Sequence, residues 1–229
     1  MSKLSQLIKD VDAVTKSYED KLAELRKALT NGSMHRGMIE EGEGELLNRM
    51  KELEKKGKKG ATVGDFYDDK EAKAYIDEIE NQKAGLVKAC GQYWQIRSSM
   101  DKIMVSAKGL VTTAGQLAAD KKRQWFGSKS LQAIEATKTD LEAWCNDMQA
   151  TLQNLDKLPK SGTPKLAWAA PGSTKKGKRN DVMDKQDLHD IKALLTFIQQ
   201  RAADDPKRAA THKRIHDRLA EVAKLNPDV

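Results

Sequence analysis

The stretch LQAIEATKTDLEAWCNDMQATLQNL, residues 131–155, decides the fold. Its apolar residues recur in alternating steps of three and four, the periodicity of a helix that packs along one seam. Such a seam must be covered by other helices, so it predicts architecture rather than chemistry. One lysine interrupts the seam, whose members are Leu131, Ile134, Lys138, Leu141, Cys145, Met148, Leu152 and Leu155.

This segment is predicted to be the second arm of a long helical hairpin over residues 70–158, folded at 125–127. The first arm, residues 69–120, carries a continuous apolar stripe of its own. Its weakest part is 109–115, where two glycines bracket β-branched residues. We expect either a kink or a continuous helix there.

At the corner, Gly127 is expected to take the left-handed conformation that ends many helices. Ser128 or Ser130 is then expected to cap the returning arm, because a serine hydroxyl can accept a bond from a free helical N–H. The arm is expected to end near Leu158, since Pro159 cannot continue it.

Before the hairpin, the sequence predicts a helix over residues 2–30 that ends at Asn31-Gly32. Four glycines in 32–44 predict a loop, and a short helix is expected over 45–56. The apolar stripe of the first helix consists of Leu4, Leu7, Val11, Val14, Tyr18, Leu22, Leu25 and Leu29.

The composition agrees with long amphipathic helices. Of 229 residues, 38% are hydrophobic, 5% aromatic and 33% charged, which suits narrow helical seams better than a sheet or a thick core. The predicted fold class is therefore all-α: an elongated antiparallel helical bundle or coiled-coil hairpin with a C-terminal helical hairpin.

Three regions are expected along the chain. Residues 1–158 form the long-helix bundle, 159–180 a basic linker rich in Pro and Gly, and 181–229 a pair of helices. Within the linker, Trp168 is expected to strap onto the bundle or onto a partner.

The final helix of the C-terminal pair is expected to begin with Asp205 as its cap and Pro206 at its first position. Two helices this short cannot bury a core alone. They are therefore expected to pack on the hairpin or on another copy through the last helix's stripe of Ile215, Leu219 and Val222.

The formal net charge of +7 comes from residues 157–180, which comprise the linker and the two residues before it. Seven cations and no acidic residue lie between Lys157 and Asn180, and the rest of the chain is formally neutral. The densest group could bind phosphates, which makes salt-sensitive nucleic-acid binding an alternative function. This phosphate-binding group is Lys175, Lys176, Lys178 and Arg179.

Two histidines four residues apart, His212 and His216, have a spacing that can place two imidazoles on one metal ion. His189 is a possible third ligand across the C-terminal pair. A solvated, cation-rich helix face is the competing interpretation, and no metal or other cofactor is expected.

A basic and aromatic tip at the hairpin corner is the main candidate for partner binding. It consists of Lys121, Lys122, Arg123, Trp125 and Phe126. If exposed, this combination suits a partner groove or an anionic membrane surface; if buried, it only caps the bundle.

No catalytic constellation can be recognised, so we expect no enzyme. Cys90 and Cys145 fall at seam-like positions and are expected to behave as small hydrophobic residues. The N-terminus lacks an apolar signal segment, and the most apolar stretch, 103–119, is too polar to insert alone, which favours a cytoplasmic location.

The expected function is thus a non-catalytic protein–protein interaction module, such as an adaptor, scaffold or chaperone-like protein, acting through helix faces on a partner or on itself. Nucleic-acid binding is one alternative. A membrane-active or exported effector is the other.

Overall fold

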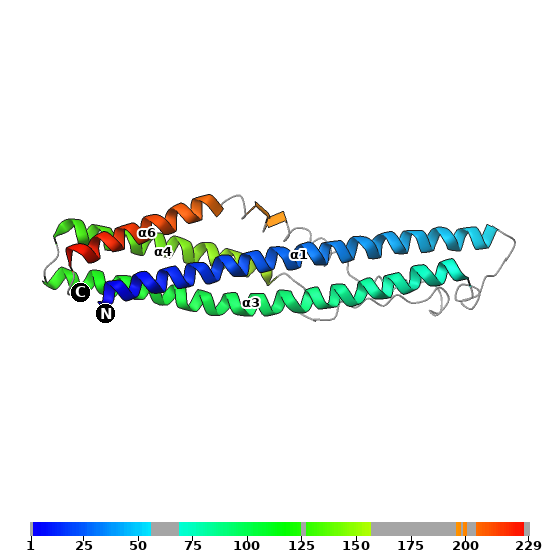
Figure 1. The fold of residues 1–229 in the computed structure, drawn as a ribbon, viewed down its shortest axis with the longest axis horizontal. Coiled ribbons are helices and arrows are strands. Elements are labelled where there is room, and N and C mark those ends of the chain that lie inside the picture. Colours follow the sequence, from blue (N-terminus) through cyan, green and yellow to red (C-terminus); the bar gives the residue numbers. More distant parts are fainter. Residues whose placement is uncertain are drawn as a thin grey trace. The chain divides into compact units, whose positions relative to one another are not determined.

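The computed structural model describes residues 2–55, 69–124, 127–156, 196–197, 199–200 and 205–226. These residues are almost entirely helical and none of them forms a strand, which confirms the all-α prediction. The helices in chain order are α1 (Lys3–Lys55), α3 (Lys70–Gln124), α4 (Ser128–Leu155) and α6 (Asp205–Leu225) (Figure 1).

Several predictions concern residues outside this description. They are the glycine-rich end of the second predicted helix, the aromatic corner at 125–126, the linker 159–180 with its Trp168 strap, and most of the first C-terminal helix. The last helix is described, and α6 begins at Asp205, one residue before the predicted first helical position at Pro206.

The chain divides into two compact units. The bundle unit contains Met1–Leu25, Ile96–Lys157 and Thr196–Val229. The paired-helix unit contains Arg26–Gln95 and Leu158–Leu195. Both α1 and α3 contribute residues to each unit, so each unit is described separately below.

Neighbouring helices of the bundle unit run in opposite directions. Lys3, at the start of α1, pairs with Asp120 near the end of α3 at 3.9 Å. Arg97 of α3 pairs with Asp156 after α4 at 2.8 Å. Apolar side chains from four helices meet between them, including Leu7, Val11, Leu22, Met100, Met104, Leu117, Ile134, Leu141, Met148, Ile215 and Leu219.

Six of the eight predicted seam positions of α4 are buried. They are Ile134, Leu141, Cys145, Met148, Leu152 and Leu155. Leu131 and Lys138 are only partly buried. A second row alternates with the first and is buried despite its polar members: Ser130, Thr137, Trp144 and Thr151.

The start of α4 differs from the prediction. Gly127 has φ −60° and ψ 147°, an extended conformation open to any residue, and it occupies the cap position itself. Ser128 and Ser130 lie inside the helix, and no side chain caps it. Instead the Ser130 N–H donates to the Gly127 carbonyl at 3.0 Å.

The predicted stop at Asn31-Gly32, the loop over 32–44 and the separate helix over 45–56 are wrong, because α1 is continuous. Each glycine inside a helix costs about 1 kcal/mol relative to alanine, but two of these glycines sit under α3. A Cβ on Gly32 would lie 1.7 Å from Tyr93 Oη, and one on Gly42 would lie 2.9 Å from Ile79 Cγ1. Close packing of the two helices therefore offsets the low helical propensity.

The same contacts define the paired-helix unit as antiparallel. Moving forward along α1 from Gly32 to Gly42, the partner residue on α3 moves backward from Tyr93 to Ile79. Between them, His35 Nδ1 and Gln82 Oε1 lie 2.7 Å apart. The described part of this unit is a two-helix seam with one polar layer.

Near the end of α1 and the start of α3, this seam is fastened by an ion pair. Arg49 of α1 donates to both carboxylate oxygens of Asp69, at 3.2 and 2.9 Å. Asp69 also caps α3 by accepting a bond from the Ala72 N–H at 3.0 Å. The bond from Arg49, together with the backbone bond, lowers the pKa of Asp69 to about 2.

The stretch 109–115 is helical throughout, so α3 is continuous. Leu110 and Ala114 are buried in the bundle unit, which holds the stretch against its neighbours. The Thr113 hydroxyl donates to the Gly109 carbonyl at 3.0 Å, so the hydroxyl of this β-branched residue has its hydrogen-bond partner within the helix.

Candidate helix-docking site

The clearest site of the bundle unit is the surface of α4 and α1 on which α6 packs, here called the α1/α4 groove. Figure 1 shows α6 lying alongside α4. Three apolar side chains of α6 are buried in this groove: Ile215, Leu219 and Val222. Burying each contributes about 1.5–3 kcal/mol relative to exposure, an upper bound for α6 because an unfolded chain already buries part of this surface.

One arginine anchors the start of α6. Arg208 is 8% exposed and its Nε lies 3.0 Å from Glu19 Oε1 of α1. A guanidinium this buried needs an anionic partner, because desolvation of an unpaired charge is costly. Glu19 thus fixes which face of α6 turns toward α1.

A shared carboxylate anchors the middle of α6 on the other wall. Asp140 of α4 accepts bonds from Arg214 at 3.1 and 3.3 Å and from Arg218 at 2.6 Å. Burial raises the pKa of Asp140, but the bonds from the two arginines outweigh this effect and the net pKa lies below its ordinary value. The carboxylate is therefore ionised at neutral pH.

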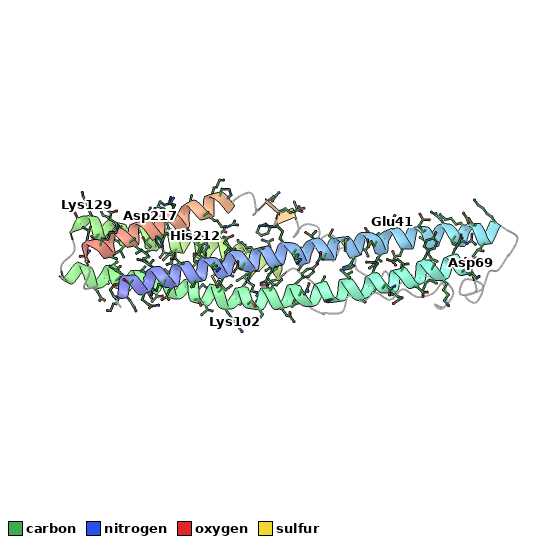
Figure 2. All side chains as sticks on the ribbon, in the orientation of Figure 1. Glu41, Asp69, Lys102, Lys129, His212 and Asp217 are labelled. Carbon is green, nitrogen blue, oxygen red and sulfur yellow. The ribbon has the colours of Figure 1, made fainter. Side chains whose placement is uncertain are left out.

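Aromatic rings line the floor between these anchors. The His212 ring of α6 stands edge-on to Trp144, with centroids 5.1 Å apart, and Trp144 stands edge-on to Tyr18 at 6.0 Å. The Tyr18 hydroxyl lies 3.3 Å from the Thr151 hydroxyl. Figure 2 labels His212 on the α6 ribbon.

Burial lowers the pKa of His212, so this ring is neutral at neutral pH. The nearby charges partly cancel, since Glu19 and Asp12 raise the pKa and Arg208 lowers it. A neutral imidazole in this position acts as a packing group against the indole of Trp144.

The two histidines proposed as a metal pair have different partners. His216 Nδ1 lies 3.2 Å from Asp12 Oδ1 of α1, whereas His212 packs on Trp144. Among the described residues, no group of three His, Cys, Asp or Glu side chains could hold a metal ion. His189 lies outside the described residues.

The structure does not describe the side chains of the other predicted site residues. Lys121, Lys122 and Arg123 belong to the last turn of α3, and their side chains are outside the description. The remaining predicted partner and phosphate residues are also outside it: Trp125, Phe126, Trp168, Lys175, Lys176, Lys178 and Arg179.

Both cysteines were predicted to be buried as small hydrophobic residues. Cys145 is a free, buried thiol, and burial raises its pKa, which keeps it protonated and unreactive. The Cys90 side chain lies outside the description.

Sequence reasoning missed the groove itself. Trp144 was passed over because its row on α4 contains Ser and Thr, although the spacing of 130, 137, 144 and 151 is a strict heptad. The ion pairs that join α6 to Glu19 and Asp140 could not be predicted from the sequence, because each joins residues far apart in the chain.

In the helices that the structure describes, none is long and apolar enough to cross a membrane. Comparison of the chain with protein-family models, with curated proteins and with solved structures gives no match.

Proposed function

We propose that this chain is a non-catalytic interaction module built on elongated antiparallel coiled-coil arms, which binds a protein partner or a second copy through exposed helix faces. The observation that carries the proposal is the exposure of two methionines on α1 in the paired-helix unit. Met34 and Met38 are 49% and 41% exposed there.

These two methionines lie next to each other on α1. Residues four apart on a helix are neighbours on one face, and Met34 and Met38 have this spacing. Methionine is flexible and polarisable, which suits a surface that must adapt to another helix. Large apolar side chains gathered on a surface mark interaction sites more often than isolated ones do.

Small residues beside the methionines allow close approach. Gly37 and Gly44 lie on the same side of α1, seven residues apart, and a Cβ at either position would meet nothing within 4 Å. Another helix could therefore lie close to the α1 backbone beside the two methionine side chains. We call Met34, Gly37, Met38 and Gly44 the outer α1 face.

The proposal is tested by charging this face in the full chain. In Met34→Lys/Met38→Lys, self-association measured by light scattering, or partner capture in a pull-down from host cells, should be lost. The matched control is Val105→Lys, since Val105 is 70% exposed on α3 in the bundle unit.

Gly37→Leu provides a second variant that fills the face without adding charge, and it should weaken the same association. If the unmodified chain is a monomer that captures no partner, the proposed function is wrong. Unchanged association in both variants would exclude the outer α1 face.

A further inference from the structure

Within the bundle unit, α6 differs from α4 in how it is held. Its buried apolar residues are Ile215, Leu219 and Val222, whereas α4 buries six large apolar or aromatic side chains along its length. It also makes polar pairs with Glu19, Asp140 and Asp12, all of which involve charged side chains. Contacts of this kind weaken with salt when they are partly exposed.

The connection to α6 also differs. Between α3 and α4 only residues 125–127 intervene, but residues 157–204 separate Asp156 from α6. A helix on a long connection can leave its groove while the short-looped helices stay together. Because α6 is covalently attached to the bundle, a competing helix must overcome its effective concentration.

The fit of α6 in the groove is incomplete. His212, a polar ring with a lowered pKa, occupies the position that faces Trp144. Trp144 Nε1 and Thr15 Oγ1 are buried without a hydrogen-bond partner among the described residues. A helix with an apolar residue in place of His212 would bury more apolar area against the same aromatic floor.

We propose that α6 is a built-in competitor, and that the α1/α4 groove binds a separate basic amphipathic helix when α6 is displaced. This partner helix carries apolar residues where α6 has His212, Ile215, Leu219 and Val222. It carries arginines that reach Glu19 and Asp140. The inference rests on the proposed interaction function but uses a surface distinct from the outer α1 face.

The charge pattern selects this class of partner. Both walls of the groove present carboxylates, from Glu19 and Asp12 on α1 and from Asp140 on α4. An acidic helix would be repelled by all three, and a neutral helix would leave Asp140 without its two arginines. A basic helix satisfies both walls in the way that α6 does.

The probe is a labelled synthetic peptide of residues 205–226 carrying His212→Met, and its binding to the full chain is measured by fluorescence anisotropy. In the chain variant Ile215→Asp/Leu219→Asp, α6 should be released. The peptide should then bind at least tenfold more tightly than to the unmodified chain. Adding Glu19→Lys and Asp140→Lys should reduce this binding at least tenfold.

A control peptide with Arg214→Glu and Arg218→Glu should bind neither chain. Equal binding to the released and unmodified chains would overturn the proposal, as would binding insensitive to the two charge reversals. These results are independent of the outer α1 face, because Met34 and Met38 are unchanged.

Hydrogen exchange on the unmodified chain tests the displacement of α6 even if the Ile215→Asp/Leu219→Asp variant does not fold. At saturating peptide, the amides of α6 should lose protection while those of α1 and α4 keep it. Unchanged protection of α6 would overturn the proposal.

Discussion

The imidazole of His212 on α6 meets the indole of Trp144 on α4 edge-on, with centroids 5.1 Å apart and ring planes at 79°. Because of this contact, protonation of the His212 ring should weaken the packing of α6 on α4. It also leaves a charged imidazole with no good environment inside the groove.

Stability should therefore fall on mild acidification. Because the pKa of His212 lies below its ordinary value of 6.5 in the folded chain, the unfolded chain takes up a proton first as the pH falls. The contribution of neutral His212 is present above about pH 6.5 and is lost below it. Thermal melts from pH 7.5 to 5.5 should show a falling Tm, and the fall should be smaller in His212→Gln.

Removing the carboxylate that two arginines share should loosen α6. Asp140→Asn should lower the free energy of unfolding by about 1–2 kcal/mol, since the three bonds from Arg214 and Arg218 lose their charged acceptor but Arg214 is half exposed. Asp120→Asn is the matched control, because Asp120 is 64% exposed and 3.9 Å from Lys3, and should change stability by less than about 0.5 kcal/mol. Equal effects of the two variants in urea denaturation would contradict the assigned role of Asp140.

Two glycines of α1 should respond oppositely to alanine. Gly32→Ala should destabilise by about 1–3 kcal/mol, because its Cβ would lie 1.7 Å from the hydroxyl oxygen of the buried Tyr93. Gly37→Ala should stabilise by about 1 kcal/mol, because nothing lies within 4 Å and alanine favours the helix. Chemical denaturation of both variants checks the prediction, and a shift of the same sign in both would contradict the close approach of α1 and α3.

The ion pair of Asp69 with Arg49 should make the stability of the paired-helix unit sensitive to acid. Its pKa of about 2 is depressed relative to 3.8, so its contribution to stability is complete above about pH 4 and is lost as the pH falls through about 2. Asp69→Asn keeps a capping side chain but loses the charge that pairs with Arg49. The stability difference between this variant and the unmodified chain should be constant from pH 7 to 5 and should shrink toward pH 2.

The control for this titration is Glu52→Gln, because Glu52 is 60% exposed and contacts the same arginine at 3.1 Å. Its effect should be smaller at every pH. Carboxyl titration followed by NMR should place the pKa of Asp69 near 2, and an ordinary value would show that the Arg49 contact is absent in solution.

The sequence was sufficient for the seams but not for their exact faces. Ile134 and Met148 were identified because apolar residues at heptad spacing have one explanation. Trp144 and Thr137 were missed since a polar or amphipathic residue in a seam looks the same as one on a wet surface. Only the positions of neighbouring helices decide between these two environments.

The break predicted in α1 shows how packing can outweigh local preference. Gly32 and Gly42 each favour a stop when judged alone, but both fall beneath bulky residues of α3. Likewise, His212 and His216 share a spacing but face Trp144 and Asp12 respectively. Neither outcome is encoded locally, because each depends on a segment far away in the chain.

The contact of Gly32 with Tyr93 also restricts how the two helices can slide past each other. A shift of seven residues would bring Tyr93 opposite Ile39, and Gly85 would no longer accommodate the ring of His35. The shift would thus lose the contacts of Gly32 with Tyr93 and of Gly85 with His35, and it would place Tyr93 against a bulky side chain. Insertions or deletions during evolution should therefore be tolerated here only when α1 and α3 change length together, each by whole seven-residue repeats.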